Sequence, residues 1–425
     1  MHAIVPRNRR QAEIGDDKPL GGHVVPIFGF AAFDLGRHHI GARRQALERI
    51  RHRNGCRHHR VGLALGQIDF GDLLMNWMLS FLLFAGALHV NINDVRSYRW
   101  PIGLLATVGV LIATTVIGSL AYWIFELFGW HISFMYCLLF GALISPTDPI
   151  AVLGVLRTAN ASKPLKTTIV GESLFNDGTA VVVFTVLLGI VQLGETPSIS
   201  ATAMLFAHEA IGGVVFGGLI GYLVYRMIKS IEQYQIEVML TLALVIGGSA
   251  MASELHVSAP IAMVVAGLII GNLGRNKAMN EMTRRYMDGF WELLDDMLNA
   301  LLFALIGMEL LLLPFSWLHL LAASVLALAI LLSRLLTVAP AIVLLRRWRT
   351  VPRGTIRILT WGGLRGGVSV ALALALPLGP ERDLILSITY IVVLSSILFQ
   401  GLTIGKLVKH VTKDAPTAPQ SENAH

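Results

Sequence analysis

Charged residues are scarce in this chain, and so are cysteines. Only 14% of its 425 residues are Asp, Glu, Lys or Arg, whereas soluble proteins carry about 25%. The two cysteines, Cys56 and Cys137, are too few for a disulfide framework and lack the spacing of a metal site. These shortages exclude an ordinary soluble enzyme, a disordered protein and a disulfide-rich scaffold. Hydrophobic residues make up 54%, which favours an all-α polytopic membrane protein, because an apolar helix satisfies its own backbone groups in lipid.

The net charge of +7 comes entirely from the first sixty residues. That segment holds twelve basic and five acidic residues, and the rest of the chain is neutral, so the charge does not indicate nucleic-acid binding. Residues 1–66 also lack an apolar run long enough to cross a bilayer. We predict that this basic segment is disordered or foreign to the fold, and that it replaces one or two N-terminal helices.

Long apolar runs follow one another from about Asp72 onward. At about 20 residues for each crossing of the bilayer, they predict eleven transmembrane spans within one domain over residues 67–410, followed by a short polar tail at 411–425. The predicted spans are 72–91, 101–128, 133–156, 167–193, 201–229, 235–253, 256–273, 288–313, 315–346, 355–379 and 383–409.

Basic residues in the loops predict the orientation. Lys and Arg occur in alternate gaps between the spans, whereas the gaps at 129–132, 194–200, 254–255 and 314 hold none. Cytoplasmic loops of membrane proteins carry an excess of Lys and Arg. We therefore expect the basic loops and the C-terminus in the cytoplasm, and the chain in the inner (plasma) membrane of the cell.

Polar residues interrupt the third predicted span, where an ionisable side chain costs about 2.5–3.5 kcal/mol on insertion scales. In the string SPTDP at 145–149, Pro146 and Pro149 flank Thr147 and Asp148. Each proline removes a backbone donor and disturbs the preceding turn. The string therefore predicts an unwound segment, whose free carbonyls and carboxylate are oxygen ligands suited to a hard cation.

A second polar group lies in GESLFNDGTA at 171–180. Glu172, Ser173, Asn176 and Asp177 fall within about 140° of one helical face, at 100° for each residue. Two carboxylates, an amide and a hydroxyl on one face inside the membrane indicate a polar site. We expect this face and the unwound segment to border one cavity.

Two further groups each centre on an arginine. Arg334 has apolar neighbours on both sides, so its guanidinium needs a carboxylate partner, and Glu172 is the candidate. Arg365 lies in GGLRGG at 362–367, where glycines permit irregular backbone and a cation offsets the carbonyls of a helix terminus. A second interrupted helix in the other half of the chain is the sequence sign of an inverted-repeat transporter with a binding site at midplane.

These strings, in this order and spacing, resemble those of the monovalent cation:proton antiporters in the bacterial branch of the sodium/proton exchanger family. The resemblance covers roughly residues 67–410. It implies the inverted-repeat antiporter fold with two crossed, unwound helices, a homodimer and an elevator-like movement.

The resemblance also implies a role for each residue of the site. Asp177 would carry the ion or the proton, and Na+ would bind at Asp177 and Asp148. The other cation ligands would be Ser173 and Thr147. A structural polar network would surround them, in which Asn176 organises the crossed helices and Arg365 balances the crossing. That network would consist of Asn176, Glu172, Arg334 and Arg365.

Two features depart from the family pattern. Family members usually have twelve or thirteen helices, and the missing ones would lie at the N-terminus, where they contribute to the dimer interface. Ala85, within Leu-Phe-Ala-Gly, stands where some relatives carry an acidic residue. No role of that acid carries over to this chain.

One buried carboxylate that holds either a proton or Na+ (or Li+), but not both, forces exchange once access alternates between the two sides. We therefore predict a secondary antiporter, not an enzyme, that needs no cofactor because the opposing ion gradient supplies the free energy. The alternatives are a K+/H+ antiporter of the same fold and an inactive, truncated exchanger. An intramembrane hydrolase is disfavoured because Ser173 has no nearby His and the chain has no H-E-x-x-H. A carrier of organic solutes is disfavoured because only Phe175 and Phe184 would line its site.

Overall fold

The computed structural model describes part of the chain. The described residues are 77–149, 152–154, 156, 163–193, 198–310, 316–347 and 354–413. The chain divides into two units, Met1–Ile68 and Asp69–His425, and all described residues belong to the second. The predicted basic segment at 1–66 and most of the predicted tail at 411–425 lie outside the described residues.

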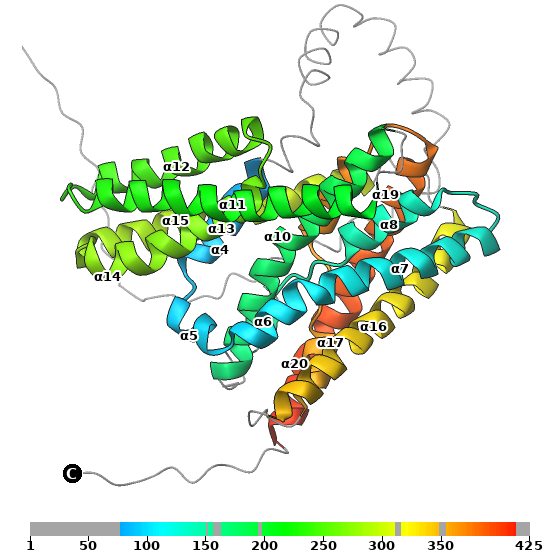
Figure 1. Ribbon diagram of the computed structural model, residues 1–425. Coiled ribbons are helices and arrows are strands. Elements are labelled where there is room, and N and C mark those ends of the chain that lie inside the picture. Colours follow the sequence, from blue (N-terminus) through cyan, green and yellow to red (C-terminus); the bar gives the residue numbers. More distant parts are fainter. Residues whose placement is uncertain are drawn as a thin grey trace, which may run out of the picture. The chain divides into compact units, whose positions relative to one another are not determined.

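The described part of the chain is helical apart from its turns, its two unwound segments and one isolated bridge (Figure 1). Two short π-helical stretches, η2 and η3, continue the helices that precede them. In chain order the elements are α4 (Leu79–Leu88), α5 (Ile92–Ser97), α6 (Arg99–Ala106), α7 (Val108–Leu127), α8 (Phe134–Ile144), α10 (Lys163–Leu193), α11 (Ile199–Ile228), α12 (Tyr234–Glu254), α13 (Ala259–Ile269), η2 (Ile270–Gly274), α14 (Arg275–Lys277), α15 (Glu281–Leu310), α16 (Trp317–Arg346), α17 (Thr355–Trp361), α18 (Gly367–Leu374), α19 (Pro380–Ser395), η3 (Ser396–Gly401) and α20 (Leu402–Lys413).

Several of these helices have the length and composition of membrane spans. Within the described residues six qualify, and three shorter apolar helices accompany them. The six are Arg99–Leu127, Leu165–Gln192, Ser200–Ile228, Tyr234–Glu254, Trp317–Arg346 and Pro380–Val411. Large apolar side chains are exposed along α11 and α16, as expected of helices that face lipid. The count of eleven spans stays a prediction, because the structure divides some of the predicted spans into shorter helices.

One predicted boundary differs from the structure. The sequence predicts a span at 288–313, whereas α15 already begins at Glu281. The side chain of Asn280 accepts a hydrogen bond from the backbone N–H of Thr283 at 2.8 Å. This bond satisfies a donor of the first turn and starts the helix earlier than its apolar pattern does.

Two irregular segments interrupt the helices near the centre of the fold. The first unwound segment, residues 145–149, follows α8, and residues 152–154 are helical again. The second unwound segment, residues 362–366, separates α17 from α18. The backbone N–H of Asp148 in the first segment donates to the carbonyl oxygen of Leu364 in the second, at 2.8 Å. This hydrogen bond satisfies two backbone groups that lie outside a helix and fixes the segments side by side.

The largest apolar core surrounds this crossing. Its buried side chains come chiefly from α7, α8, α10, α16, α18 and α19, and a second cluster joins α4, α11, α12, α13 and α15. Small residues let the helices approach closely. A Cβ atom at Gly141 of α8 would lie only 2.2 Å from the carbonyl oxygen of Thr114 of α7. The core therefore holds the first unwound segment at a fixed depth against α10.

Candidate functional site

Four polar side chains of the candidate site lie well inside α10. The helix begins at Lys163, so Glu172 and Asp177 are far from its N-terminus and do not cap it. Glu172, Ser173 and Asn176 are at most 3% exposed, and Asp177 is half-buried. Because burying a polar group without a hydrogen bond costs free energy, the partners of these side chains decide what the site can do.

Ser173 and Asn176 tie α10 to the first unwound segment. The hydroxyl of Ser173 donates to the carbonyl oxygen of Thr147 at 2.6 Å. The side-chain amide of Asn176 donates to the hydroxyl of Thr147 at 2.9 Å. A carbonyl oxygen has two lone pairs, so the oxygen of Thr147 keeps one for another partner. These two bonds hold the neighbouring Asp148 against α10.

Arg334 of α16 forms an ion pair with Glu172 of α10, which confirms the predicted pairing. The two side chains are 10% and 2% exposed, and the Nε of Arg334 also donates to the carbonyl oxygen of Leu359 at 3.4 Å. A buried charge is tolerated when an opposite charge lies beside it. The pair therefore neutralises Glu172, one of the three carboxylates at the crossing.

Arg365 reaches across from the second unwound segment and is only 3% exposed. Its Nη1 donates to the carbonyl oxygens of Ser145 and Pro146, at 2.5 and 2.9 Å. Its backbone N–H donates to the hydroxyl of Ser396 at 3.0 Å. Carbonyls at the C-terminus of a helix carry partial negative charge. The guanidinium of Arg365 therefore offsets the carbonyls that follow α8.

A cavity of about 10 Å³ lies between α10, α16, α17 and the first unwound segment. This is roughly the smallest volume that holds one water molecule, so the cavity suits a single small occupant. Its polar lining residues are Thr147, Asp148, Glu172, Ser173 and Arg334.

Asp177 lies one turn of α10 beyond Ser173 and outside the lining of this cavity. In the part of the chain that the structure describes, no hydrogen bond or ion pair reaches its carboxylate. That carboxylate is close enough to those of Asp148 and Glu172 for the charges to interact. A cation between Asp177 and Asp148 would relieve the repulsion between two carboxylates supplied by different helices.

Gly366 brings the second unwound segment against Asp148. A Cβ atom at Gly366 would lie 2.6 Å from both the Cβ and the Oδ2 of Asp148. Atoms that are not bonded do not approach this closely, so any other side chain would displace Asp148. Gly363 makes a similar approach to Arg334, at 2.9 Å from its Nε. The two glycines therefore let the crossing form around charged side chains.

One neighbour of the site, Asp295 of α15, is absent from the predicted set. Its carboxylate interacts electrostatically with that of Asp148. The sequence carries a signal for it in the spacing of Asp288, Glu292 and Asp295, because residues at i, i+4 and i+7 share one helical face. The structure also brings together, at one crossing, all eight residues that the sequence predicts for the site.

The sequence of this chain matches known proteins over most of its length. Residues 59–410 match the family described as "Sodium/hydrogen exchanger, transmembrane". The Na(+)/H(+) antiporter NhaP of Pseudomonas aeruginosa is 72% identical over 363 residues, which cover 84% of this chain and 85% of that protein. The Na(+)/H(+) antiporter NhaH of Halobacillus dabanensis is 33% identical over 348 residues, with coverages of 80% and 83%.

The fold has a counterpart among solved structures. The sodium proton antiporter MjNhaP1 from Methanocaldococcus jannaschii superimposes with a TM-score of 0.63 at 21% sequence identity, over 78% of this chain and 83% of that one. The chain therefore has the antiporter fold that the resemblance implies, and its apolar helices make it a multi-pass membrane protein. On the extent of the family match and the identity to NhaP, this chain belongs to the sodium/hydrogen exchanger family.

Proposed function

We propose that this chain exchanges Na+ (or Li+) for H+ across the cytoplasmic membrane, and that Asp177 carries the ion or the proton. The observation that supports this most is the contrast between two carboxylates on one helix. Glu172 is paired with Arg334, whereas Asp177 has no ion pair among the described residues and faces the charge of Asp148. The relatives named above are Na(+)/H(+) antiporters, which favours sodium as the cation.

The cation would be held by oxygen atoms from two elements. The carboxylates of Asp148 and Asp177, the hydroxyl of Ser173 and the backbone carbonyl of Thr147 are the proposed ligands, and oxygen ligands suit hard cations. When the cation leaves, a proton on Asp177 neutralises a half-buried carboxylate that would otherwise face the negative charge of Asp148. The site therefore holds either one cation or one proton, which couples the two movements.

Exchange of this kind needs no enzyme chemistry and no cofactor, because the gradient of one ion supplies the free energy for the other. We infer from the family resemblance that the chain works as a homodimer through an elevator-like movement. The alternation of basic and uncharged loops supports the proposed orientation, with the C-terminus in the cytoplasm of the cell. Lipid surrounds the exposed apolar faces of α11 and α16.

The proposal is tested in everted membrane vesicles from an exchanger-deficient bacterium that expresses the full chain. Respiration acidifies the vesicle interior, and a dye reports the internal pH. We expect added Na+ or Li+ to raise the internal pH, and K+ to have little effect. Because protons compete for the same carboxylate, the Na+ concentration for half-maximal exchange should rise as the pH falls.

Vesicles without the chain provide the control for this experiment. A response to K+ alone would replace the sodium proposal with the potassium alternative. The same measurement is made on a shorter chain of residues 61–425. If neither chain responds to Na+, Li+ or K+, the proposed exchange is contradicted and the inactive, truncated exchanger is favoured.

Gly366→Ala is expected to lower the exchange rate about tenfold or more. In enzymes, moving a reacting group by about 1 Å lowers the rate by a factor of this size or larger, and we expect a similar loss when a cation ligand is moved. The added methyl group would occupy the position of the Asp148 side chain and push it from the crossing. The initial rate of Na+-dependent pH change measures the effect. Gly218→Ala on α11 is the matched control, because a Cβ atom there meets nothing within 4 Å. Equal rates in the two variants would show that the close approach at Gly366 is not required.

A further inference from the structure

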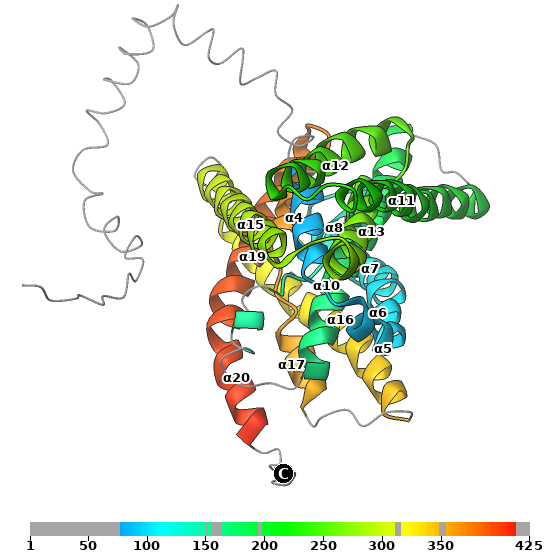
Figure 2. The same ribbon diagram turned by 90° about the vertical axis from the view of Figure 1, so that its left-hand side faces the viewer.

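A groove outside the proposed ion site runs along α16, α17 and α20. Its volume is about 730 Å³, within the range of roughly 300–1,000 Å³ that is usual for ligand pockets. The short helix α17 packs against both α16 and α20, and it lies between them (Figure 2). α17 therefore forms the floor of the groove, and the other two helices form its walls.

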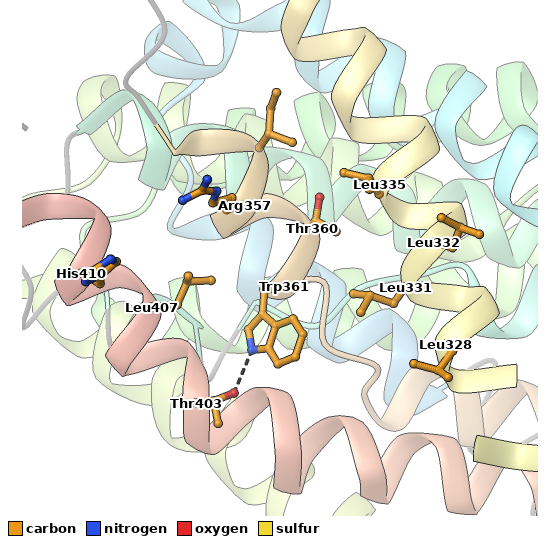
Figure 3. A pocket seen from close by; sticks show the side chains of 11 residues that line it. Leu328, Leu331, Leu332, Leu335, Arg357, Thr360, Trp361, Thr403, Leu407 and His410 are labelled. Atoms are coloured by element: carbon orange, nitrogen blue, oxygen red, sulfur yellow. Dashed lines mark hydrogen bonds between the residues drawn. The ribbon is translucent and has the colours of Figure 1, made fainter. Parts of the chain in front are cut away.

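The α16 wall is a continuous apolar stripe. It consists of Leu328, Leu331, Leu332 and Leu335, which share one helical face at i, i+3, i+4 and i+7 (Figure 3). Leu328 and Leu332 are 70% and 54% exposed, so the helices of the described chain leave this stripe largely uncovered. In a membrane protein such a stripe contacts acyl chains rather than water.

Basic side chains stand at one end of the groove. Arg357 of α17 and His410 of α20 line it, about one and two helical turns from the Trp361–Thr403 pair, which also lines the groove. There the indole N–H of Trp361 donates to the hydroxyl of Thr403 at 2.8 Å (Figure 3). The groove therefore has a cationic end and an apolar end.

The charged residues of the three helices that form the groove are all basic. α16, α17 and α20 contain no Asp or Glu. Besides Arg357 and His410, the exposed basic residues near the same ends of these helices are Arg346, Arg347, Lys406 and Lys409. A cluster of basic residues beside an apolar surface attracts anionic lipid headgroups. A soluble anion would account for only the basic end of the groove.

We propose that this groove binds one anionic glycerophospholipid, with its phosphate between Arg357 and His410 and an acyl chain along the four leucines of α16. A guanidinium forms bidentate, charge-assisted hydrogen bonds with phosphate oxygens. The leucine stripe supplies the apolar contact that the acyl chain requires. The net negative charge of the lipid complements the positive charge at the basic end of the groove.

The groove also lies next to the proposed ion site. A cavity of about 370 Å³ shares Leu328, Leu331 and Trp361 with the groove and extends to Arg334 and Arg365. Trp361 is the last residue of α17, directly before the second unwound segment. A lipid in the groove therefore packs against the helix that leads into the crossing and holds that helix in place.

Native mass spectrometry of the full chain in detergent tests the proposal, with phosphatidylglycerol and phosphatidylcholine as the two probes. We expect one phosphatidylglycerol to be retained in preference to phosphatidylcholine. Arg357→Gln should weaken phosphatidylglycerol binding about fivefold, the effect of one charge near a membrane surface. Arg357→Lys should bind this lipid more tightly than Arg357→Gln and less tightly than the unchanged chain, because Lys keeps the charge but not the bidentate hydrogen bonds. Leu332→Trp should also weaken it, by filling the groove without changing the charge. Lys229→Gln, a basic residue at the end of α11, is the matched control.

Thermal unfolding in the same detergent shows whether each variant keeps its fold. Equal retention of the two lipids would overturn the proposal, because the basic end would then select nothing. Unchanged phosphatidylglycerol binding in both Arg357→Gln and Leu332→Trp would place the lipid elsewhere. If the spectra show a dimer of the chain without bound lipid, and Leu332→Trp abolishes that dimer, the groove is an interface between copies of the chain and the lipid proposal is wrong. Lipid binding is measured without transport, so none of these outcomes depends on the proposed exchange.

Discussion

Asp177→Asn is expected to reduce Na+-dependent proton movement to the background of vesicles without the chain. The amide keeps the size of the side chain, but it cannot take up a proton at physiological pH and supplies no negative charge to a cation. Because Asp177 has no hydrogen bond or ion pair among the described residues, its replacement breaks no interaction of either kind in the described fold. The initial rate of dye response to added Na+ measures the loss, and thermal unfolding verifies that the protein is folded.

Asp383→Asn is the control for that variant. Asp383 lies in the first turn of α19, and its side chain is 69% exposed, so its charge is solvated and exchange should be unaffected. Sodium-driven proton movement at the normal rate in Asp177→Asn would rule out this residue as the carrier and would leave Asp148 as the remaining candidate at the crossing.

The second large effect concerns the ion pair between Glu172 and Arg334. Glu172→Gln and Arg334→Gln should each destabilise the protein by about 3–5 kcal/mol, because each leaves the opposite charge buried without a partner. The double variant should recover much of that loss, because it buries no net charge. Thermal unfolding of the four proteins in one detergent gives the double-mutant cycle.

Arg382 and Asp383 form a matched comparison for this cycle. They are 3.9 Å apart, with side chains 17% and 69% exposed. Because the charge of Asp383 is solvated, a pair of this kind contributes about 0–1 kcal/mol. If the effects of Glu172→Gln and Arg334→Gln simply add in the double variant, the two charges are not coupled and the pair does not hold α16 to α10.

Local signals in the sequence predicted much of the fold. The prolines in SPTDP and the glycines in GGLRGG mark the two segments that the structure leaves outside its helices, because both residue types act on the backbone where they stand. The pairing of Glu172 with Arg334 was also predictable, since a buried guanidinium requires an anion. The resemblance to the exchanger family is confirmed by the match over residues 59–410.

Features that depend on contacts between distant residues could not be predicted in this way. The hydrogen bond between Asp148 and Leu364 joins two segments that are far apart in the chain, and nothing in either segment specifies its partner. The closeness of Asp295 to Asp148 depends on where α15 packs. The early start of α15 depends on a capping side chain, Asn280, which the apolar pattern does not contain. The roles of the individual site residues in transport stay predictions.

One hydrogen bond across the crossing joins two main-chain groups, those of Asp148 and Leu364, and this affects how the position opposite Asp148 tolerates change. Leu364 contributes only its carbonyl oxygen to the hydrogen bond, and every amino acid has that group. Evolutionary drift at position 364 is therefore limited by the space around its side chain and not by the bond itself. At position 148 the only residue type that lacks the donor is proline.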